Sequence, residues 1–223
     1  MNFNENADRD MAIMNVAHAV TSDLRKCLLN HEFASFAVPG GTTPGPIFDA
    51  MSSVDLDWDR VHVMLTDERW VPEDHARSNA GLVKSRLMTG NAAAAKFLSF
   101  YREGMTAQEA APGISEDFAA DMPISVLLLG MGADMHTASL FPGAPGVEAA
   151  MARNAPLVCA VTPADQPEER ITFSAQALDG AMNKHLVIFG DDKKAAFERA
   201  QRLSPLEAPI SAVITEGTVH WAA

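Results

Sequence analysis

Short, almost uninterrupted apolar runs, separated by segments with helical spacing, restrict the possible folds of this chain more than any other feature. Six runs do not alternate between apolar and polar residues, which is typical of strands buried on both faces. They cover residues 33–38, 61–66, 124–130, 156–162, 185–190 and 209–214. Between and beside them we expect helices over 10–30, 44–52, 78–88, 174–182 and 191–203. This order predicts an α/β fold with three layers (α/β/α) around a mostly parallel sheet.

Length and charge narrow the class of protein further. The chain has 223 residues, of which 48% are hydrophobic, and no Pro/Gly-rich linker or internal repeat divides it. We therefore expect a single domain over residues 1–223. The formal net charge is −12 and no basic tract is present, so we expect no nucleic-acid partner. An anionic small molecule would need locally gathered Arg and Lys side chains.

The cysteines and the N-terminal segment predict a cytoplasmic protein. Cys27 and Cys159 are too few for a disulfide framework and form no C-x-x-C pair. The first ten residues are polar and acidic and lack the apolar core of a signal peptide. No apolar run approaches the roughly 18 residues of a membrane span. We expect reduced thiols and no membrane partner.

Polar loops follow three of the predicted strands, and ligands of parallel α/β sheets collect at such strand ends. The first loop contains Gly40, Gly41, Thr42, Thr43 and Pro44. Two glycines, two hydroxyl groups and a proline in the first turn of a helix suit an anion such as phosphate. A tight strand-to-helix turn capped by a threonine fits the same residues. The Walker lysine is absent, so the pattern leaves both interpretations open.

The second loop, residues 67–70, carries three charges directly after a strand. A solvated turn explains such charges in most proteins. Arg69, however, follows a strand that neighbours the glycine loop, and its planar guanidinium matches phosphate oxygens. Asp67 and Arg69 are therefore candidate ligands of a bound molecule. Ser78 is predicted to cap the next helix, and Asn79 is predicted either to belong to that cap or to face the pocket.

The third loop places Asp134 and His136 on a turn after Gly130 and Gly132. The spacing of the glycines resembles the start of a dinucleotide fingerprint, but Met135 occupies the third glycine position. Ser139 does not lie in the G-x-S-x-G pattern of serine hydrolases. A carboxylate beside a histidine can hold one tautomer and produce a general base, although a capping or surface histidine fits equally well. We expect no metal site, because no second His or Cys lies at ligand spacing.

Two cations further along the chain are also candidate anion ligands. Arg170 lies at the start of a short predicted strand, and Lys193 follows Gly190 by three residues. Either is compatible with an ordinary surface charge. In a chain this acidic, a cation at the start of a strand or helix is also a candidate for binding an anion.

Taken in order, these segments resemble the 6-phosphogluconolactonase family. The resemblance rests on PGGTTP, TDERWVP with Ser78 and Asn79 after it, LLLGMGADMHTASLFPG, ERITF and FGDDK, and it extends from about residue 33 to 214. It implies the sugar-phosphate isomerase/deaminase type of fold, hydrolysis of 6-phosphoglucono-δ-lactone in the pentose phosphate pathway, and no cofactor. His136 matches the catalytic histidine of the family and Asp134 the acid beside it. Residues at positions associated with the sugar phosphate are Gly41, Thr42, Arg69 and Arg170, with Lys193 a looser match.

The chain departs from the family at two places. Met135 stands where the family usually has glycine, so its side chain would crowd the lactone or its backbone would adopt a positive φ. The short, polar N-terminal segment leaves open whether the usual first strand is present.

The expected mechanism is attack on the lactone by water that His136 activates, with backbone N–H groups near Gly130 and Gly132 stabilising the oxyanion. Two alternatives are a glucosamine-6-phosphate deaminase or sugar-phosphate isomerase on the same fold, and a non-catalytic sugar-phosphate-binding domain. We expect a monomer or a small homo-oligomer.

Overall fold

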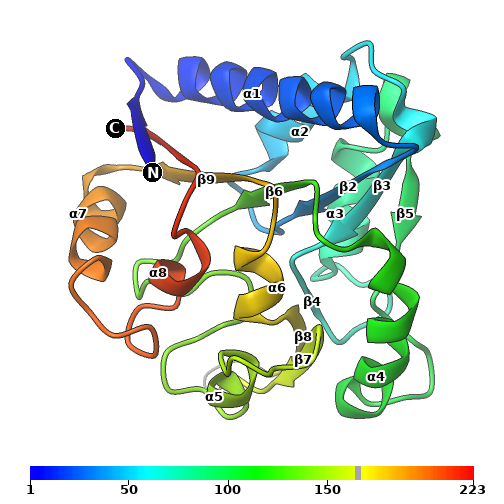
Figure 1. Cartoon of the computed structure of the whole chain (residues 1–223), viewed down its shortest axis with the longest axis vertical. Coiled ribbons are helices and arrows are strands. Elements are labelled where there is room, and N and C mark those ends of the chain that lie inside the picture. Colours follow the sequence, from blue (N-terminus) through cyan, green and yellow to red (C-terminus); the bar gives the residue numbers. More distant parts are fainter. Residues whose placement is uncertain (164–166) are drawn as a thin grey trace.

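Seven parallel strands form the main sheet of the protein. The structure is a computed structural model that describes residues 1–163 and 167–223. All neighbouring strands in this sheet pair in parallel. Their order across the sheet in Figure 1 is β1 (Asn2–Glu5), β10 (Thr218–Ala222), β9 (Asn183–Phe189), β6 (Val126–Leu129), β2 (Ala34–Val38), β3 (Val61–Leu65) and β5 (Lys96–Leu98). The predicted three-layer α/β fold is confirmed.

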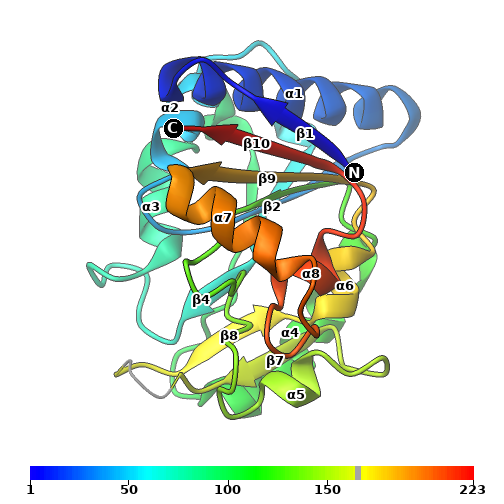
Figure 2. The same ribbon diagram turned by 90° about the vertical axis from the view of Figure 1, so that its left-hand side faces the viewer.

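Helices cover both faces of this sheet. The long helix α1 (Arg9–Asn30) lies beside α2 (Gly45–Ser52) over one face, whereas α7 (Asp191–Ala200) packs against β9 on the other side (Figures 1 and 2). Asp8 caps α1 by accepting a hydrogen bond from the N–H of Met11. The buried residues of α1, including Val16, Val20 and Leu24, recur at helical spacing and face the core. The five predicted helices are therefore all present, with α3 (Asn79–Arg86) and α6 (Ala175–Asp179) as the remaining two.

A second, smaller sheet was not predicted. It contains three antiparallel strands in the order β4 (Asp67–Arg69), β8 (Arg170–Phe173) and β7 (Val158–Val161). The run 156–162 is therefore a strand, but it does not join the parallel sheet. An uninterrupted apolar run indicates that a strand is buried on both faces, but it does not show which strand pairs with it. Residues 67–69, which we interpreted as a loop, also pair in this sheet.

The prediction of a strand over residues 209–214 is wrong, because this segment contains the one-turn helix α8 (Ile210–Val213). Ile210, Val213 and Ile214 are buried. Their spacing of three and four residues is helical, and the first residue of the segment, Pro209, suits a helix start. A short apolar run cannot by itself distinguish a buried strand from a buried helix.

Several other elements were not predicted from the sequence. Thr106 and Glu109 form a reciprocal capping box at the start of α4 (Ala107–Asp117), a pattern that would have predicted this helix. The short helix α5 (Val147–Ala150) and the edge strand β5 carry few distinguishing residues. The first strand is present as β1, although all four of its residues are exposed.

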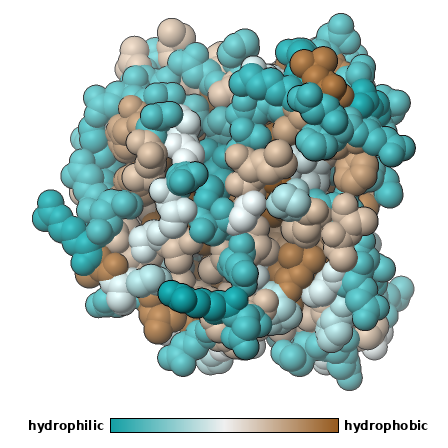
Figure 3. Space-filling view, viewed as in Figure 1, coloured by the Kyte–Doolittle hydropathy of each residue, from teal (hydrophilic) through white to brown (hydrophobic). Residues whose placement is uncertain are grey.

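Hydrophilic residues predominate around the outline of the face in Figure 3, while mildly apolar residues occupy much of its middle. Within residues 1–163 and 167–223, none of the helices combines the length and the apolar character that crossing a bilayer requires. Cys27 and Cys159 are both buried as free thiols.

Candidate active site

A cavity of about 400 Å³ lies where β2, β3, β6 and β9 end. Because the strands are parallel, their carboxyl ends and the loops that follow them meet at one edge of the sheet. His136 lines this cavity. So do all the predicted ligands, which are Gly40, Gly41, Thr42, Thr43, Asp67, Arg69, Asn79, Gly130, Gly132, Arg170 and Lys193. The fold thus brings together residues that lie more than 150 positions apart in the chain.

The glycine loop presents backbone N–H groups beside the start of α2. Gly41 has a φ of 88°, which a residue with a side chain adopts only with strain. The N–H groups of Thr42 and Thr43 donate to no backbone carbonyl in the described part of the chain. A Cβ atom on Gly40 would lie 1.9 Å from Oδ1 of Asn79, so this glycine permits close packing of the loop against α3. Free N–H groups at a helix start favour a negatively charged ligand.

Strand pairing places two arginines side by side. Arg69 on β4 lies directly opposite Arg170 on β8, and residues opposite each other in an antiparallel pair share one face. Arg69 Nη1 donates a 2.6 Å hydrogen bond to the carbonyl of Arg77. Arg170 is only 3% exposed, and this burial lowers the pKa of its guanidinium, with attraction to Asp67 acting against the shift. Guanidinium groups nevertheless stay protonated in proteins, so the pair concentrates positive charge in the cavity wall.

Asp67 lies beside these arginines and is held by hydroxyl groups. Its Oδ2 accepts a 2.5 Å hydrogen bond from Ser139 Oγ, and its Oδ1 accepts one of 3.1 Å from Thr66 Oγ1. Asp67 is 7% exposed. The carboxylate of Asp67 is well placed to balance the charge of Arg170. Its hydrogen bonds from Ser139 and Thr66 already use part of its capacity to accept.

Asp134 and His136 form a close pair, in which His136 lines the cavity, whereas Asp134 is not among the described residues that line it. Asp134 Oδ1 lies 2.5 Å from Nδ1 of His136. The hydrogen bond with His136 lowers the pKa of Asp134, while partial burial acts in the opposite direction. An ionised carboxylate accepts a hydrogen bond from Nδ1–H, which leaves the lone pair of Nε2 to accept a proton. This tautomer is the one that a general base requires.

The loop that carries this pair has an unusual backbone. Met135 has a φ of 69° and Ala138 a φ of 48°, and both are non-glycine residues. The positive φ expected for Met135 is therefore present. Its side chain is 8% exposed and packs in the hydrophobic core, and it is not among the described residues that line the cavity. Met135 consequently does not crowd the space in which a substrate would bind.

One expected oxyanion donor is already engaged. The N–H of Gly132 donates a 2.9 Å hydrogen bond to the carbonyl of His136, which closes the turn around the Asp134–His136 pair. A Cβ atom on Gly132 would lie 2.2 Å from Nδ1 of His136. Gly132 therefore serves the turn and the packing of the imidazole, and the expectation that its N–H stabilises an oxyanion is wrong for this conformation.

Phe141 and Lys193 complete the surroundings of the pair. The ring of Phe141 lies 4.5 Å from that of His136, measured between centroids. Lys193 is the third residue of α7 and its Nζ donates a hydrogen bond to the carbonyl of Met131. Burial lowers the pKa of Lys193, and the charge of Asp134 acts against this shift. Sequence reasoning did not single out Phe141, which only the fold of the loop brings to the imidazole.

Glu68 is another residue that sequence reasoning passed over. It is 1% exposed and lies behind the cavity wall. Ser78 caps α3 as predicted, while Asn79 both begins the helix and lines the cavity. Within residues 1–163 and 167–223, no group of three or more His, Cys, Asp or Glu side chains is arranged to hold a metal ion.

Comparisons with known proteins agree with this geometry. A family model described as "Glucosamine-6-phosphate isomerases/6-phosphogluconolactonase" matches residues 7–221. A 6-phosphogluconolactonase of Pseudomonas aeruginosa is 39% identical, over 92% of this chain and 88% of the relative. The crystal structure of a 6-phosphogluconolactonase from Shewanella baltica is 31% identical with a TM-score of 0.94, over 100% of this chain and 98% of that one. A monomeric glucosamine-6-phosphate deaminase has a TM-score of 0.83 over 100% of this chain and 97% of its own, but only 14% identity, so it shares the fold alone.

Proposed function

The chain belongs to the glucosamine-6-phosphate isomerase/6-phosphogluconolactonase family, and from this we infer that it is a 6-phosphogluconolactonase. Its reaction is the hydrolysis of 6-phospho-D-glucono-1,5-lactone to 6-phospho-D-gluconate in the oxidative pentose phosphate pathway. The observation that carries the mechanism proposed below is that His136, paired with Asp134, lines the same cavity as Arg69 and Arg170.

In the proposed mechanism, His136 acts as a general base and then as a general acid. Nε2 takes a proton from water as the water oxygen forms a bond to C1 of the lactone. The tetrahedral intermediate then collapses, the bond between C1 and the ring oxygen breaks, and the imidazolium returns the proton to that oxygen. Asp134 holds the ring in the required tautomer and stabilises the imidazolium that forms. A lactone is an activated ester, so this single base suffices without a covalent intermediate.

The glycine loop and the two arginines line the same cavity as His136 and would hold the phosphate. The N–H groups of Thr42 and Thr43, the guanidinium groups of Arg69 and Arg170, and the ammonium group of Lys193 supply donors and positive charge. Binding energy from this remote group fixes C1 beside the base and lowers the barrier by orienting the reactants. Asn79 and Gly130 also line the cavity, and we assign them to substrate binding.

A lactone-hydrolysis assay, corrected for spontaneous ring opening, tests this function. The wild type should hydrolyse the phosphorylated lactone. His136→Ala should lower kcat by about 10²–10⁴-fold, which is the usual contribution of a general base. Arg170→Ala should mainly raise KM, because it removes a contact made equally in the ground state and the transition state. Full activity of His136→Ala above the spontaneous rate would refute the mechanism, and binding of 6-phosphogluconate without turnover by the wild type would indicate a binding domain.

We further propose that the enzyme is a single domain that works in the cytoplasm as a monomer or a small homo-oligomer. Its substrate is a small diffusible molecule, and the net charge of −12 disfavours nucleic acid as a partner. Light scattering during size-exclusion chromatography would give the oligomeric state.

A further inference from the structure

Glu68 is a buried carboxylate that accepts four hydrogen bonds. Oε1 accepts from the backbone N–H groups of Arg69 (2.7 Å) and Asn79 (2.8 Å). Oε2 accepts from the N–H of Ala80 (2.8 Å) and from Ser78 Oγ (3.0 Å). A carboxylate with four partners and 1% exposure has almost no remaining capacity to bind a ligand itself. Its contacts instead join strand β4 to the first turn of helix α3.

These contacts hold two residues of the cavity wall. Arg69 is held at both ends, because its N–H donates to Glu68 and its guanidinium donates to the carbonyl of Arg77. Asn79 is tied through its N–H to Glu68 and through Nδ2 to the carbonyl of Asp67, at 2.9 Å. Both side chains therefore depend on the geometry that Glu68 sets.

The same connection extends to the glycine loop. The side chain of Asn79 occupies the space that a Cβ atom on Gly40 would fill, so the loop rests directly against this residue. Three parts of the cavity wall that lie apart in the sequence thus share one support: the glycine loop, Arg69 and Asn79.

We propose that Glu68 is a positioning residue that sets the affinity of the site for the phosphate of the substrate. It acts through Arg69, Asn79 and the glycine loop, and it does not touch the substrate itself. The inference rests on the proposed function and names one further determinant of its specificity.

The chemistry of the position favours a carboxylate over its closest isostere. Burial raises the pKa of Glu68, and the hydrogen bonds from Asn79, Ala80 and Arg69 oppose that shift. Each of its two oxygens faces a backbone N–H group. In Glu68→Gln, whichever way the amide turns, its NH₂ group faces at least one of these donors, so a buried donor loses its acceptor. The segment 77–80 would then have to shift.

Calorimetric titration with 6-phosphogluconate and with unphosphorylated gluconate tests the proposal on the full chain. Glu68→Gln should weaken the binding of 6-phosphogluconate by about tenfold, the contribution of about one hydrogen bond to a charged group lost when the segment 77–80 shifts, and leave gluconate unchanged. In kinetics, KM for the phosphorylated lactone should rise by a similar factor while kcat changes by less than about threefold. Glu73→Gln is a matched control, because Glu73 forms a surface ion pair with Lys84 and should behave as wild type.

The alternative is a purely structural role. It would lower the activity toward phosphorylated and unphosphorylated lactones in equal proportion, through the folded fraction alone, and this result would overturn the proposal. Unchanged affinity of folded Glu68→Gln for 6-phosphogluconate would overturn it as well. If Glu68→Gln does not fold, Ser78→Ala removes one of the four donors and should weaken 6-phosphogluconate binding by about two- to threefold. The titration does not depend on turnover, so it tests Glu68 even if the wild type fails to hydrolyse the lactone.

Discussion

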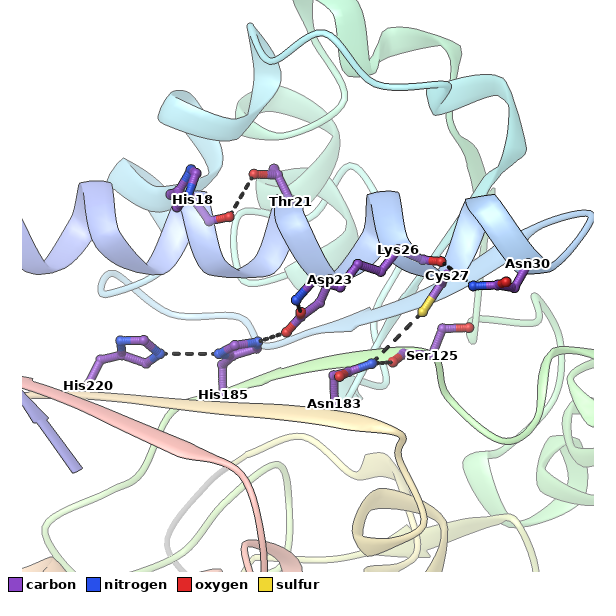
Figure 4. Close-up of polar contacts among 10 residues, drawn as sticks. All are labelled: His18, Thr21, Asp23, Lys26, Cys27, Asn30, Ser125, Asn183, His185 and His220. Carbon is purple, nitrogen blue, oxygen red and sulfur yellow. Dashed lines mark hydrogen bonds and ion pairs between the residues drawn. The ribbon is translucent and has the colours of Figure 1, made fainter. Parts of the chain in front are cut away.

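Replacing His220 should make the stability of the protein less sensitive to acid. His220 lies on β10 and is 2% exposed. Figure 4 shows it in a row with His185 and Asp23 beneath α1, with 3.2 Å between the two imidazoles and 3.0 Å from His185 to the carboxylate. Because His185 donates to Asp23 through Nε2, its Nδ1 accepts from Nε2–H of His220. Nδ1 of His220 has no hydrogen-bond partner within the described residues, so a proton there would be buried without an acceptor.

The magnitude follows from the pKa of this imidazole. Burial, and secondly the proximity of His185, lowers the pKa of His220 to about 4, whereas histidine in an unfolded chain titrates near ~6.5. Well above pH ~6.5 the ring is neutral in both the folded and the unfolded protein, so it adds no pH dependence to the free energy of unfolding. As the pH falls toward about 4, the unfolded chain gains a proton that the native state excludes, so stability is lost. The loss is about 2 kcal/mol between pH ~7.5 and ~5, and about 3 kcal/mol once it is complete.

Urea unfolding at these two pH values measures the effect. His220→Gln keeps an N–H donor at a similar reach toward His185 but does not titrate, so its loss of stability on acidification should be smaller than that of the wild type by about 2 kcal/mol. His18→Gln is a matched control, because His18 is an exposed residue of α1 and its replacement should leave the pH dependence as it is. If His220→Gln and the wild type lose equal stability, His220 is not the buried neutral group described above.

Two substitutions in the loop that carries Asp134 and His136 should separate activity from stability. Gly132→Ala places a methyl group 2.2 Å from Nδ1 of His136, so it should displace the imidazole. A lactone-hydrolysis assay should then show kcat lowered by about 10²-fold or more. A kcat equal to that of the wild type would contradict the close packing of Gly132 against His136. Met135→Gly relieves the strain of a positive φ, worth about 1 kcal/mol, but removes a buried side chain worth about 2 kcal/mol or more. Urea unfolding should therefore show a net destabilisation of about 1–2 kcal/mol, with KM changed by less than about twofold. A marked gain in activity would instead mean that the Met135 side chain reaches the substrate.

The sequence predicted the elements whose residues carry their own signal. The five helices have caps or apolar spacing that act within a few residues, and four apolar runs are strands of the parallel sheet. The segment 209–214 was assigned incorrectly, and 156–162 was correctly assigned as a strand but lies in the smaller antiparallel sheet, because an apolar run reports burial alone. An apolar run does not show which strand will pair with it. Over only six residues, it also does not distinguish a strand from one turn of helix.

The candidate site was likewise predicted only in part from the sequence. Residue types and their positions at strand ends and starts made Asp134, His136, Arg69 and Arg170 candidates, and the resemblance to a family assigned their roles. That the polar loops meet was an inference from the parallel sheet, in which strand ends lie at one edge. The structure shows that His136, Arg69 and Arg170 line one cavity.

By itself, the sequence determined the fold class and the chemical groups of the site, because hydrophobic period and side-chain chemistry are local properties. The tertiary structure decided the contacts between segments far apart in the chain. The pairing of β4 with β8 sets Arg69 opposite Arg170, the hydrogen bonds of Glu68 join β4 to α3, and the turn around Gly132 uses the N–H that we expected to stabilise the oxyanion. Each of these depends on strand register and on backbone direction, which are fixed only when the whole core packs.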